Sequence, residues 1–159
     1  MVDTRRPAVV DRLLPLAVVS ALNPLLRAVL RSPLHHAASK HLMILHVTGR
    51  KSGRIYDVPV GRHQYNGQLV ASAGGRWRVN LSRGADVHVT LDGRRRRAHA
   101  ELIDDPQRVA EIFAALITQL GPKHANRLGM KINVNRVPTV DEVRAATADR
   151  GVVRLTLLD

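Results

Sequence analysis

Two dipeptides, Asn66-Gly67 and Asp92-Gly93, constrain the fold of this chain more than any other feature. Both central residues of a type I′ turn need a positive φ angle, and Asn-Gly and Asp-Gly are pairs that adopt it at little cost. Each dipeptide lies between two runs whose residues have the pattern of strands. Each therefore predicts a β-hairpin, and two hairpins in succession predict an antiparallel sheet.

The spacing of the apolar residues after position 40 predicts six strands and two helices. We place the strands at residues 41–47, 56–65, 68–72, 87–91, 95–103 and 152–158. A helical turn is predicted at 76–81 and helices at 107–120 and 141–146, with Gly121-Pro122 ending the longer one. Both helices fall between the fifth and sixth strands, which favours a closed or split barrel over alternating βαβ units. The predicted class is α+β, mainly β.

The first forty residues have a different period. Apolar residues recur at helical spacing, so we predict an amphipathic helical segment over residues 1–34, ahead of a barrel over residues 35–159 in one structural domain. An uncharged run at 13–26 resembles a signal peptide, but Pro15 and Pro24 interrupt it. The run is also shorter than the ~20 residues that span a bilayer. We expect a cytoplasmic protein whose N-terminal helix lies on the inner face of the cell membrane or lines the pocket.

Composition excludes several classes of function. The chain has no cysteine, so disulfides, thiolate metal sites and cysteine nucleophiles are excluded, and redox chemistry requires a bound cofactor. The formal net charge of +12 attracts phosphates, nucleic acid and anionic lipid. Only 3% of residues are aromatic, however, and binding of single-stranded nucleic acid relies on stacking aromatics, so that function is disfavoured. No pair of histidines has convincing metal-ligand spacing, and we predict no metal.

The segment most informative about chemistry is Thr48-Gly49-Arg50-Lys51-Ser52-Gly53-Arg54, between the first two predicted strands. Its glycines let backbone amides turn outward, and its basic and hydroxyl side chains add donors, which together form a cradle for an anion. Two or three charge-assisted hydrogen bonds of about 1.5–3 kcal/mol each would hold a phosphorylated group at micromolar affinity or better. The segment is not a P-loop, because the glycine spacing is too short and no helix follows the lysine. A solvated basic turn is the alternative interpretation.

The order of this segment and its neighbours resembles the deazaflavin-dependent nitroreductase family, whose members use coenzyme F420. The matching stretches are residues 42–47, 48–54, 58–60, 66–67, 71–75, 77, 80–81, 87–98 and 141–144. The resemblance covers roughly residues 25–158. It implies a six-stranded antiparallel split β-barrel of the FMN-binding type, with an N-terminal amphipathic helix and peripheral helices.

The resemblance also implies roles for individual residues. Lys51, Ser52 and Arg54 match positions that hold the phosphate and acidic tail of the cofactor. The other implied cofactor-binding residues are Thr48, Gly49 and Arg50 in the same loop, Val58, Pro59 and Val60 at the edge of the ring, Ser72, Ala73, Gly74 and Gly75 at its reactive face, and Trp77 and Asn80 closing the site. Ser72 is in addition the candidate for a proton relay or a substrate contact.

The implied function is transfer of a hydride from reduced F420 to an apolar acceptor: a quinone, an unsaturated lipid or a nitro compound. Nitroreductase-like members carry tyrosines in their last third, whereas this chain has no aromatic residue after Phe113, which favours a quinone or lipid. The alternatives are FMN in place of F420, or a non-catalytic barrel that binds FMN, haem or a fatty ligand. Expected partners are a small hydrophobic substrate, the membrane surface and a second copy in a homodimer, without specific nucleic acid.

Overall fold

A computed structural model describes residues 7–11, 24–25, 28, 32 and 40–158 of the chain. In this part of the chain, seven strands form one antiparallel sheet in the order β3-β2-β6-β7-β9-β5-β4. These strands are β2 (Leu42–Thr48), β3 (Ile55–Gly61), β4 (His63–Tyr65), β5 (Gln68–Ala73), β6 (Ala85–Leu91), β7 (Arg94–Ile103) and β9 (Gly151–Leu157). The predicted antiparallel α+β class is confirmed.

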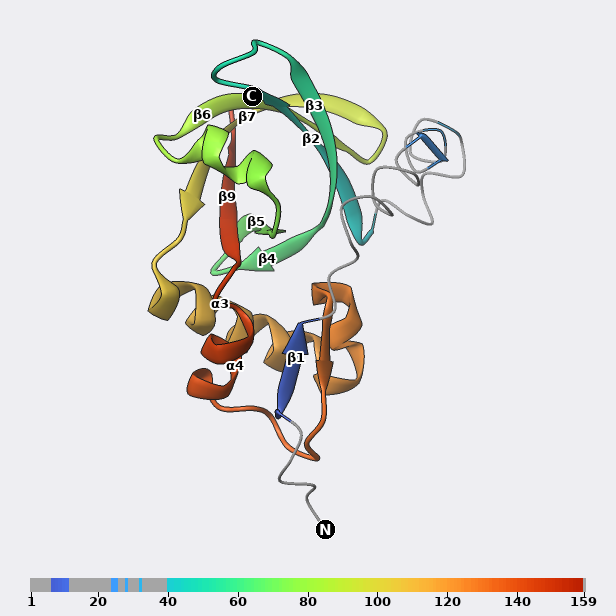
Figure 1. Cartoon of the computed structure of the whole chain (residues 1–159). Helices are drawn as coiled ribbons and strands as arrows, with labels where there is room; N and C mark the ends of the chain where they lie inside the picture. Colours follow the sequence, from blue (N-terminus) through green and yellow to red (C-terminus); the bar gives the residue numbers. More distant parts are fainter. Residues whose placement is uncertain (1–6, 12–23, 26–27, 29–31, 33–39, 159) are drawn as a thin grey trace.

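The sheet has seven strands rather than the predicted six, because the strand predicted at 56–65 is divided at Arg62. The backbone N–H of Arg62 donates to the carbonyl of His41 at 2.8 Å, one step beyond the Leu42–Gly61 pair, and the next residue, His63, already pairs with β5. On one side of this break β3 pairs with β2, and on the other β4 pairs with β5. Because a single residue joins the two ends of the strand order, the sheet curls into a half-barrel (Figure 1).

Both hairpins form at the predicted dipeptides. Asn66 and Asp92 have φ angles of 50° and 49°, and the glycines that follow them have φ angles of 73° and 74°. These are the positive values that a type I′ turn requires. The turns fix the register of the β4–β5 and β6–β7 pairs, so inward-facing side chains of these strands reach the core.

Two helices lie beyond the β4–β5 end of the sheet in Figure 1. Helix α3 (Pro106–Leu120) begins at Asp105, whose side chain accepts from the N–H of Arg108 at 3.0 Å, and it buries an apolar face. Helix α4 (Val140–Ala146) begins with a capping box between Thr139 and Glu142. Two 3-10 helices, η1 (Arg76–Leu81) and η2 (Pro122–Leu128), are the other helical elements within residues 40–158. All but η2 were predicted.

The structure corrects the prediction at the start of the N-terminal segment. Residues Val9–Asp11 form strand β1, which pairs with β8 (Met130–Ile132), where a helical period had been predicted. Tertiary pairing overrides the local pattern here, because β1 supplies the buried side chain of Val9 to the core under α3. Most of the predicted helix lies outside the described residues, and the division of the chain at residue 34 stays a prediction. No helix in the described part is long and apolar enough to cross a membrane.

Two aliphatic clusters form the core. One fills the interior of the curled sheet, and the other lies between the sheet and the helices. Strand β9 serves both, because Val153 faces the first cluster while its neighbour Val152 faces the second. The interior of the curled sheet is therefore filled by side chains.

Candidate functional site

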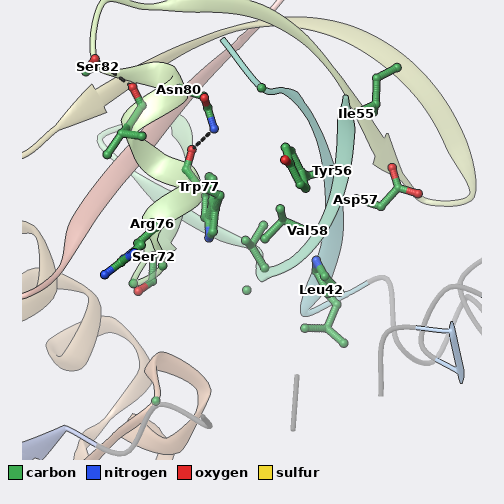
Figure 2. Close-up of a pocket in the computed structure, with 18 of the residues that line it drawn as sticks. Leu42, Ile55, Tyr56, Asp57, Val58, Ser72, Arg76, Trp77, Asn80 and Ser82 are labelled. Carbon is green, nitrogen blue, oxygen red and sulfur yellow. Dashed lines mark hydrogen bonds between the residues drawn. The ribbon is translucent and has the colours of Figure 1, made fainter. Parts of the chain in front are cut away.

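A large cleft lies where the curled sheet is open. Strand β3 pairs only with β2, and residues 71–73 of β5 pair only with β9, so no ladder joins the facing edges of β3 and β5. The cleft between them has a volume of about 1490 Å³, and η1, η2 and the turn at 49–52 complete its walls (Figure 2). Unpaired strand edges present N–H and C=O groups, so the backbone can hydrogen-bond a ligand here.

Most residues predicted to bind a cofactor line this cleft: Gly49, Arg50, Lys51, Ser52, Val58, Pro59, Val60, Ser72, Gly74, Gly75, Trp77 and Asn80. Three other predicted residues do not line it. Thr48 is exposed at the end of β2, Arg54 is exposed where the turn meets β3, and Ala73 is buried in the interior cluster. The structure thus brings the predicted residues together in one place, while their contacts with a ligand stay predictions.

The turn at 48–54 is closed by its own backbone. Gly49 donates to the carbonyl of Arg54 at 2.7 Å, and Gly53 donates to the carbonyl of Gly49 at 2.9 Å. Gly53 has a φ angle of 69°, which favours glycine. A Cβ atom at Gly49 would lie 2.7 Å from the Ser52 hydroxyl and 2.9 Å from the ring of Tyr56. The turn therefore needs both glycines to hold its shape.

Arg50 joins this turn to η1. Its backbone N–H donates to Asn80 Oδ1 at 3.0 Å, and its guanidinium donates to the Val79 carbonyl at 3.0 Å and to Ser82 Oγ at 2.7 Å. Asn80 in turn donates from Nδ2 to the carbonyl of Trp77 at 3.0 Å. Arg50 is thus engaged with the protein, and its predicted role in cofactor binding stays a prediction.

Lys51 and Arg54 differ from Arg50 in their surroundings. Both are exposed, and neither makes an ion pair with another side chain in the described part of the chain. The Ser52 hydroxyl lies between them and accepts from the N–H of Arg54 at 3.2 Å, which leaves its own O–H available to donate. Two cations without ion pairs and a hydroxyl donor thus lie within four residues, and their binding of an anionic group stays a prediction.

Two aromatic side chains face each other across the cleft. Figure 2 shows Tyr56 and Val58 pointing from β3 toward Trp77 on η1, whereas Asp57 points the opposite way. Tyr56 is 43% exposed and was not among the predicted site residues. The signal was present, because side chains two apart on a strand share a face and Val58 and Val60 had been predicted to line the site.

Two side-chain atoms in the cleft wall are buried without a hydrogen-bond partner, Ser72 Oγ and His63 Nε2. His63 is 8% exposed on β4, and burial lowers the pKa of its imidazole, assisted by the nearby charges of His41 and Arg127. Ser72 was predicted as a site residue and His63 was not. A histidine on a strand is most often exposed or satisfied by backbone, so its sequence position alone did not single it out.

The end of η2 closes the cleft beside His63, and residues 126–129 contribute to the wall. The buried side chain of Arg150 holds this segment by donating to the carbonyls of Leu128 and Gly129, the second at 2.6 Å. The guanidinium also lies 5.5 Å from the centre of the Phe113 ring. No sequence signal pointed to this wall, because an irregular segment and a distant arginine form it together.

One polar network lies beside the cleft. His46 Nδ1 and Asp57 Oδ1 are 2.7 Å apart, and His46 Nε2 and Thr90 Oγ1 are 2.8 Å apart, so the network crosses three adjacent strands. Among the residues that the structure describes, no group of three or more His, Cys, Asp or Glu side chains is placed to hold a metal ion. The network links the side chains of strands β3, β2 and β6 beside the cleft.

Comparisons with known proteins identify one family. Residues 32–140 match the family described as F420H(2)-dependent quinone reductase. No curated protein sequence matches the chain significantly.

A search of solved structures also found similar chains. A conserved hypothetical protein from Mycobacterium tuberculosis has 14% identity and a TM-score of 0.48, with 94% of this chain and 84% of that chain covered. A chain described as a domain-swapped dimer has 17% identity and a TM-score of 0.47, covering 86% and 98%. A protein described as a 5-nitroimidazole antibiotic resistance protein from Bacteroides thetaiotaomicron has 11% identity and a TM-score of 0.44, covering 95% and 84%.

Proposed function

The chain belongs to the F420H(2)-dependent quinone reductase family, and from this membership we propose that it transfers a hydride from reduced F420 to an apolar acceptor bound in the cleft between β3 and β5. Membership makes the protein an oxidoreductase whose cofactor is coenzyme F420, which confirms the resemblance found in the sequence. The acceptor, the residues that bind each ligand and the chemistry of the cleft are the proposed part.

The residues of the cleft fit the cofactor. At one end, Lys51 lines the cleft and Arg54 lies beside it where the turn meets β3, and both are cations without ion-pair partners among the described side chains, as an acidic tail requires. In the middle, Val58 and Trp77 offer apolar walls to a flat ring. Beyond them, the orphaned Ser72 Oγ is a buried polar atom that a bound group would satisfy. The single observation that carries the proposal is the order of these surfaces along one cleft: first charged, then apolar, then polar without a hydrogen-bond partner.

The protein's own groups have separable tasks. Lys51, Arg54 and the hydroxyl of Ser52 hold the anionic tail and so place the ring against the apolar wall. Val58, Val60 and Trp77 exclude water from the site of transfer. Ser72 Oγ presents a hydroxyl that can donate a hydrogen bond to an acceptor oxygen or pass it a proton. When bound, reduced F420 supplies the hydride, so the chain needs no redox group of its own.

We further propose that the acceptor is a quinone, with an unsaturated lipid or a nitro compound as the alternatives. The exposed apolar side chains of Ile55 and Val79, at 60% and 58%, support an apolar acceptor because both line the cleft. The +12 charge and the uncharged run at 13–26 support a cytoplasmic protein that lies on the inner face of the membrane. The predicted homodimer stays a prediction.

The test is a fluorescence titration of the purified protein with oxidised F420, with FMN titrated in parallel. We expect F420 to bind at micromolar affinity or better and FMN to bind more weakly. The double variant Lys51→Ala/Arg54→Ala should weaken F420 binding at least tenfold, because two charge-assisted contacts of about 1.5–3 kcal/mol each are lost. Arg83→Ala/Arg97→Ala, which removes two exposed charges outside the cleft lining, is the matched control. If the two double variants weaken F420 binding equally, the effect comes from the overall positive charge and not from a specific tail site. Tighter binding of FMN than of F420 would favour the FMN alternative.

A further inference from the structure

The two unsatisfied atoms of the cleft wall have a property in common. In the described part of the chain, His63 Nε2 and Ser72 Oγ are the buried side-chain nitrogen or oxygen atoms without a hydrogen-bond partner, and both residues line the same cleft. A buried polar atom without a hydrogen-bond partner destabilises the folded protein. Such atoms are rare in folded proteins, and two of them in one cleft indicate a place where a ligand supplies the missing partners.

These atoms lie at the opposite end of the cleft from the cationic turn. A strand rises about 3.3 Å per residue, so the chain from Ile55 to His63 extends for up to roughly 26 Å. His63 is the register partner of Val70 on β5, and Ser72 follows two residues later on the same face of that strand. Diagonal neighbours of this kind are about 7–8 Å apart, so one ligand group can reach both side chains.

The protonation state of His63 defines what it can bind. Nε2 has no hydrogen-bond partner among the described residues. Burial lowers the pKa of the imidazole and the charges of His41 and Arg127 lower it further, against a backbone hydrogen bond with Arg127 that raises it. The net lowering favours the neutral ring near pH 7. In the tautomer that carries its proton on Nδ1, Nε2 is a bare acceptor that needs an O–H or N–H partner.

Gly61 gives the ring its room. A Cβ atom at Gly61 would lie 2.7 Å from His63 Nε2 and 3.4 Å from the Arg127 carbonyl. The imidazole therefore packs directly over the backbone of Gly61, where β3 ends. This packing holds Nε2 in the wall of the cleft.

We propose that His63 Nε2 and Ser72 Oγ form a polar subsite at the far end of the cleft, where His63 accepts a hydrogen bond from an O–H or N–H group of the ligand. This inference rests on the proposed function and extends it to a residue and a ligand class. A quinone has carbonyl oxygens and no O–H, whereas its reduced form has hydroxyl groups. For such an acceptor, the subsite favours the hydroxylated form over the oxidised one. An N–H group of the cofactor is the other source of the same chemistry.

Two histidine variants separate the nitrogens. His63→Asn keeps an amide N–H near the position of Nδ1 but has no atom at the position of Nε2. His63→Gln places an amide oxygen near Nε2 and gives up the position of Nδ1. Variants that fold with wild-type circular dichroism therefore differ in the presence of the acceptor, and Ser72→Ala tests the second atom.

The experiment measures binding of 1,4-dihydroxynaphthalene and of 1,4-dimethoxynaphthalene by anaerobic calorimetry, with F420 titrated separately. We expect the wild type to prefer the dihydroxy compound about 3- to 10-fold, as one hydrogen bond gives. His63→Asn should abolish the preference, and His63→Gln should retain part of it. Loss of F420 affinity in His63→Asn, with the naphthalene preference unchanged, would assign the donor to the cofactor and still support the subsite.

Wild-type behaviour of His63→Asn toward all three ligands would overturn the subsite. Failure of the wild type itself to bind F420 would instead refute the proposed function, so the two failures are distinguishable. If His63→Asn does not fold, two other results together would overturn the subsite. The first is a wild type without preference for the dihydroxy compound, and the second is wild-type F420 affinity in both His63→Gln and Ser72→Ala.

Discussion

Replacing Arg50 tests whether the anion-binding turn positions the aromatic wall. The guanidinium of Arg50 donates to the Val79 carbonyl and to Ser82 Oγ, both in or beside η1, and η1 carries Trp77. Arg50→Ala removes these two bonds but keeps the backbone bond from residue 50 to Asn80 Oδ1. If the tail occupies the turn while the ring contacts Trp77, Arg50 links the two halves of the binding site.

The expected magnitude follows from the bonds lost. A typical net contribution is about 0.5–1.5 kcal/mol per hydrogen bond, and Arg50 is exposed, so we expect about 1–2 kcal/mol for the pair. A difference of about 1.4 kcal/mol changes an equilibrium constant tenfold. The equilibrium constant for η1 lying against the turn should therefore fall by a factor of roughly 5 to 30. F420 affinity should fall by a similar or smaller factor. The melting temperature should change little, because the sheet and its two aliphatic clusters keep their contacts.

The chain offers a specific assay, because Trp77 is its only tryptophan. Acrylamide quenching of the tryptophan emission should be stronger in Arg50→Ala than in the wild type. Arg50→Lys keeps the charge but lacks the planar fork that reaches two acceptors, so it should resemble Arg50→Ala in quenching. A fall in F420 affinity with unchanged quenching of Trp77 would refute the link and place Arg50 in direct contact with the ligand.

The remaining predictions concern the far wall and the N-terminal segment. Arg150→Met should lower the free energy of unfolding by about 2–4 kcal/mol in urea titrations, because it leaves the Leu128 and Gly129 carbonyls unpaired in a buried place; a loss under 1 kcal/mol would mean that water replaces the guanidinium. Changing Leu13, Leu14 and Leu16 to serine should reduce sedimentation with anionic vesicles while F420 affinity stays the same; equal loss of both would make this segment part of the cofactor site. Substitution is preferable to truncation, since β1 pairs with β8.

Local sequence signals predicted most of the sheet. Asn66-Gly67 and Asp92-Gly93 set their hairpins through backbone preferences that act within four residues, and the structure follows them. The helical spacing of the apolar residues in α3 likewise predicts which face of this helix is buried. What local signals could not supply is the break at Arg62, because it depends on which strand each half of the predicted strand meets.

Long-range pairing accounts for the rest of the differences. The three residues of β1 gain their structure from β8, more than a hundred positions away, so their own period was a poor guide. The same holds for the site: the turn at 48–54 was predicted from its composition, whereas the contacts of Arg50 with η1 and of Arg150 with η2 join distant segments. His63 shows the difference most clearly, since its chemistry comes from burial and not from its neighbours in sequence.

The scarcity of aromatic residues gives the two in the cleft more weight. The core is aliphatic apart from Phe113, with Trp77 packed against the cluster inside the sheet, and Tyr56 and Trp77 each lie against a glycine in the lining of the cleft. A Cβ atom at Gly49 would lie 2.9 Å from the Tyr56 ring, and one at Gly75 would lie 2.6 Å from the Trp77 indole. These glycines therefore do more than turn the chain, because each lets a flat side chain lie against the backbone. A cleft walled by two flat side chains suits a flat ring better than branched aliphatic residues would, which is why composition and glycine positions together, rather than either alone, point to the site.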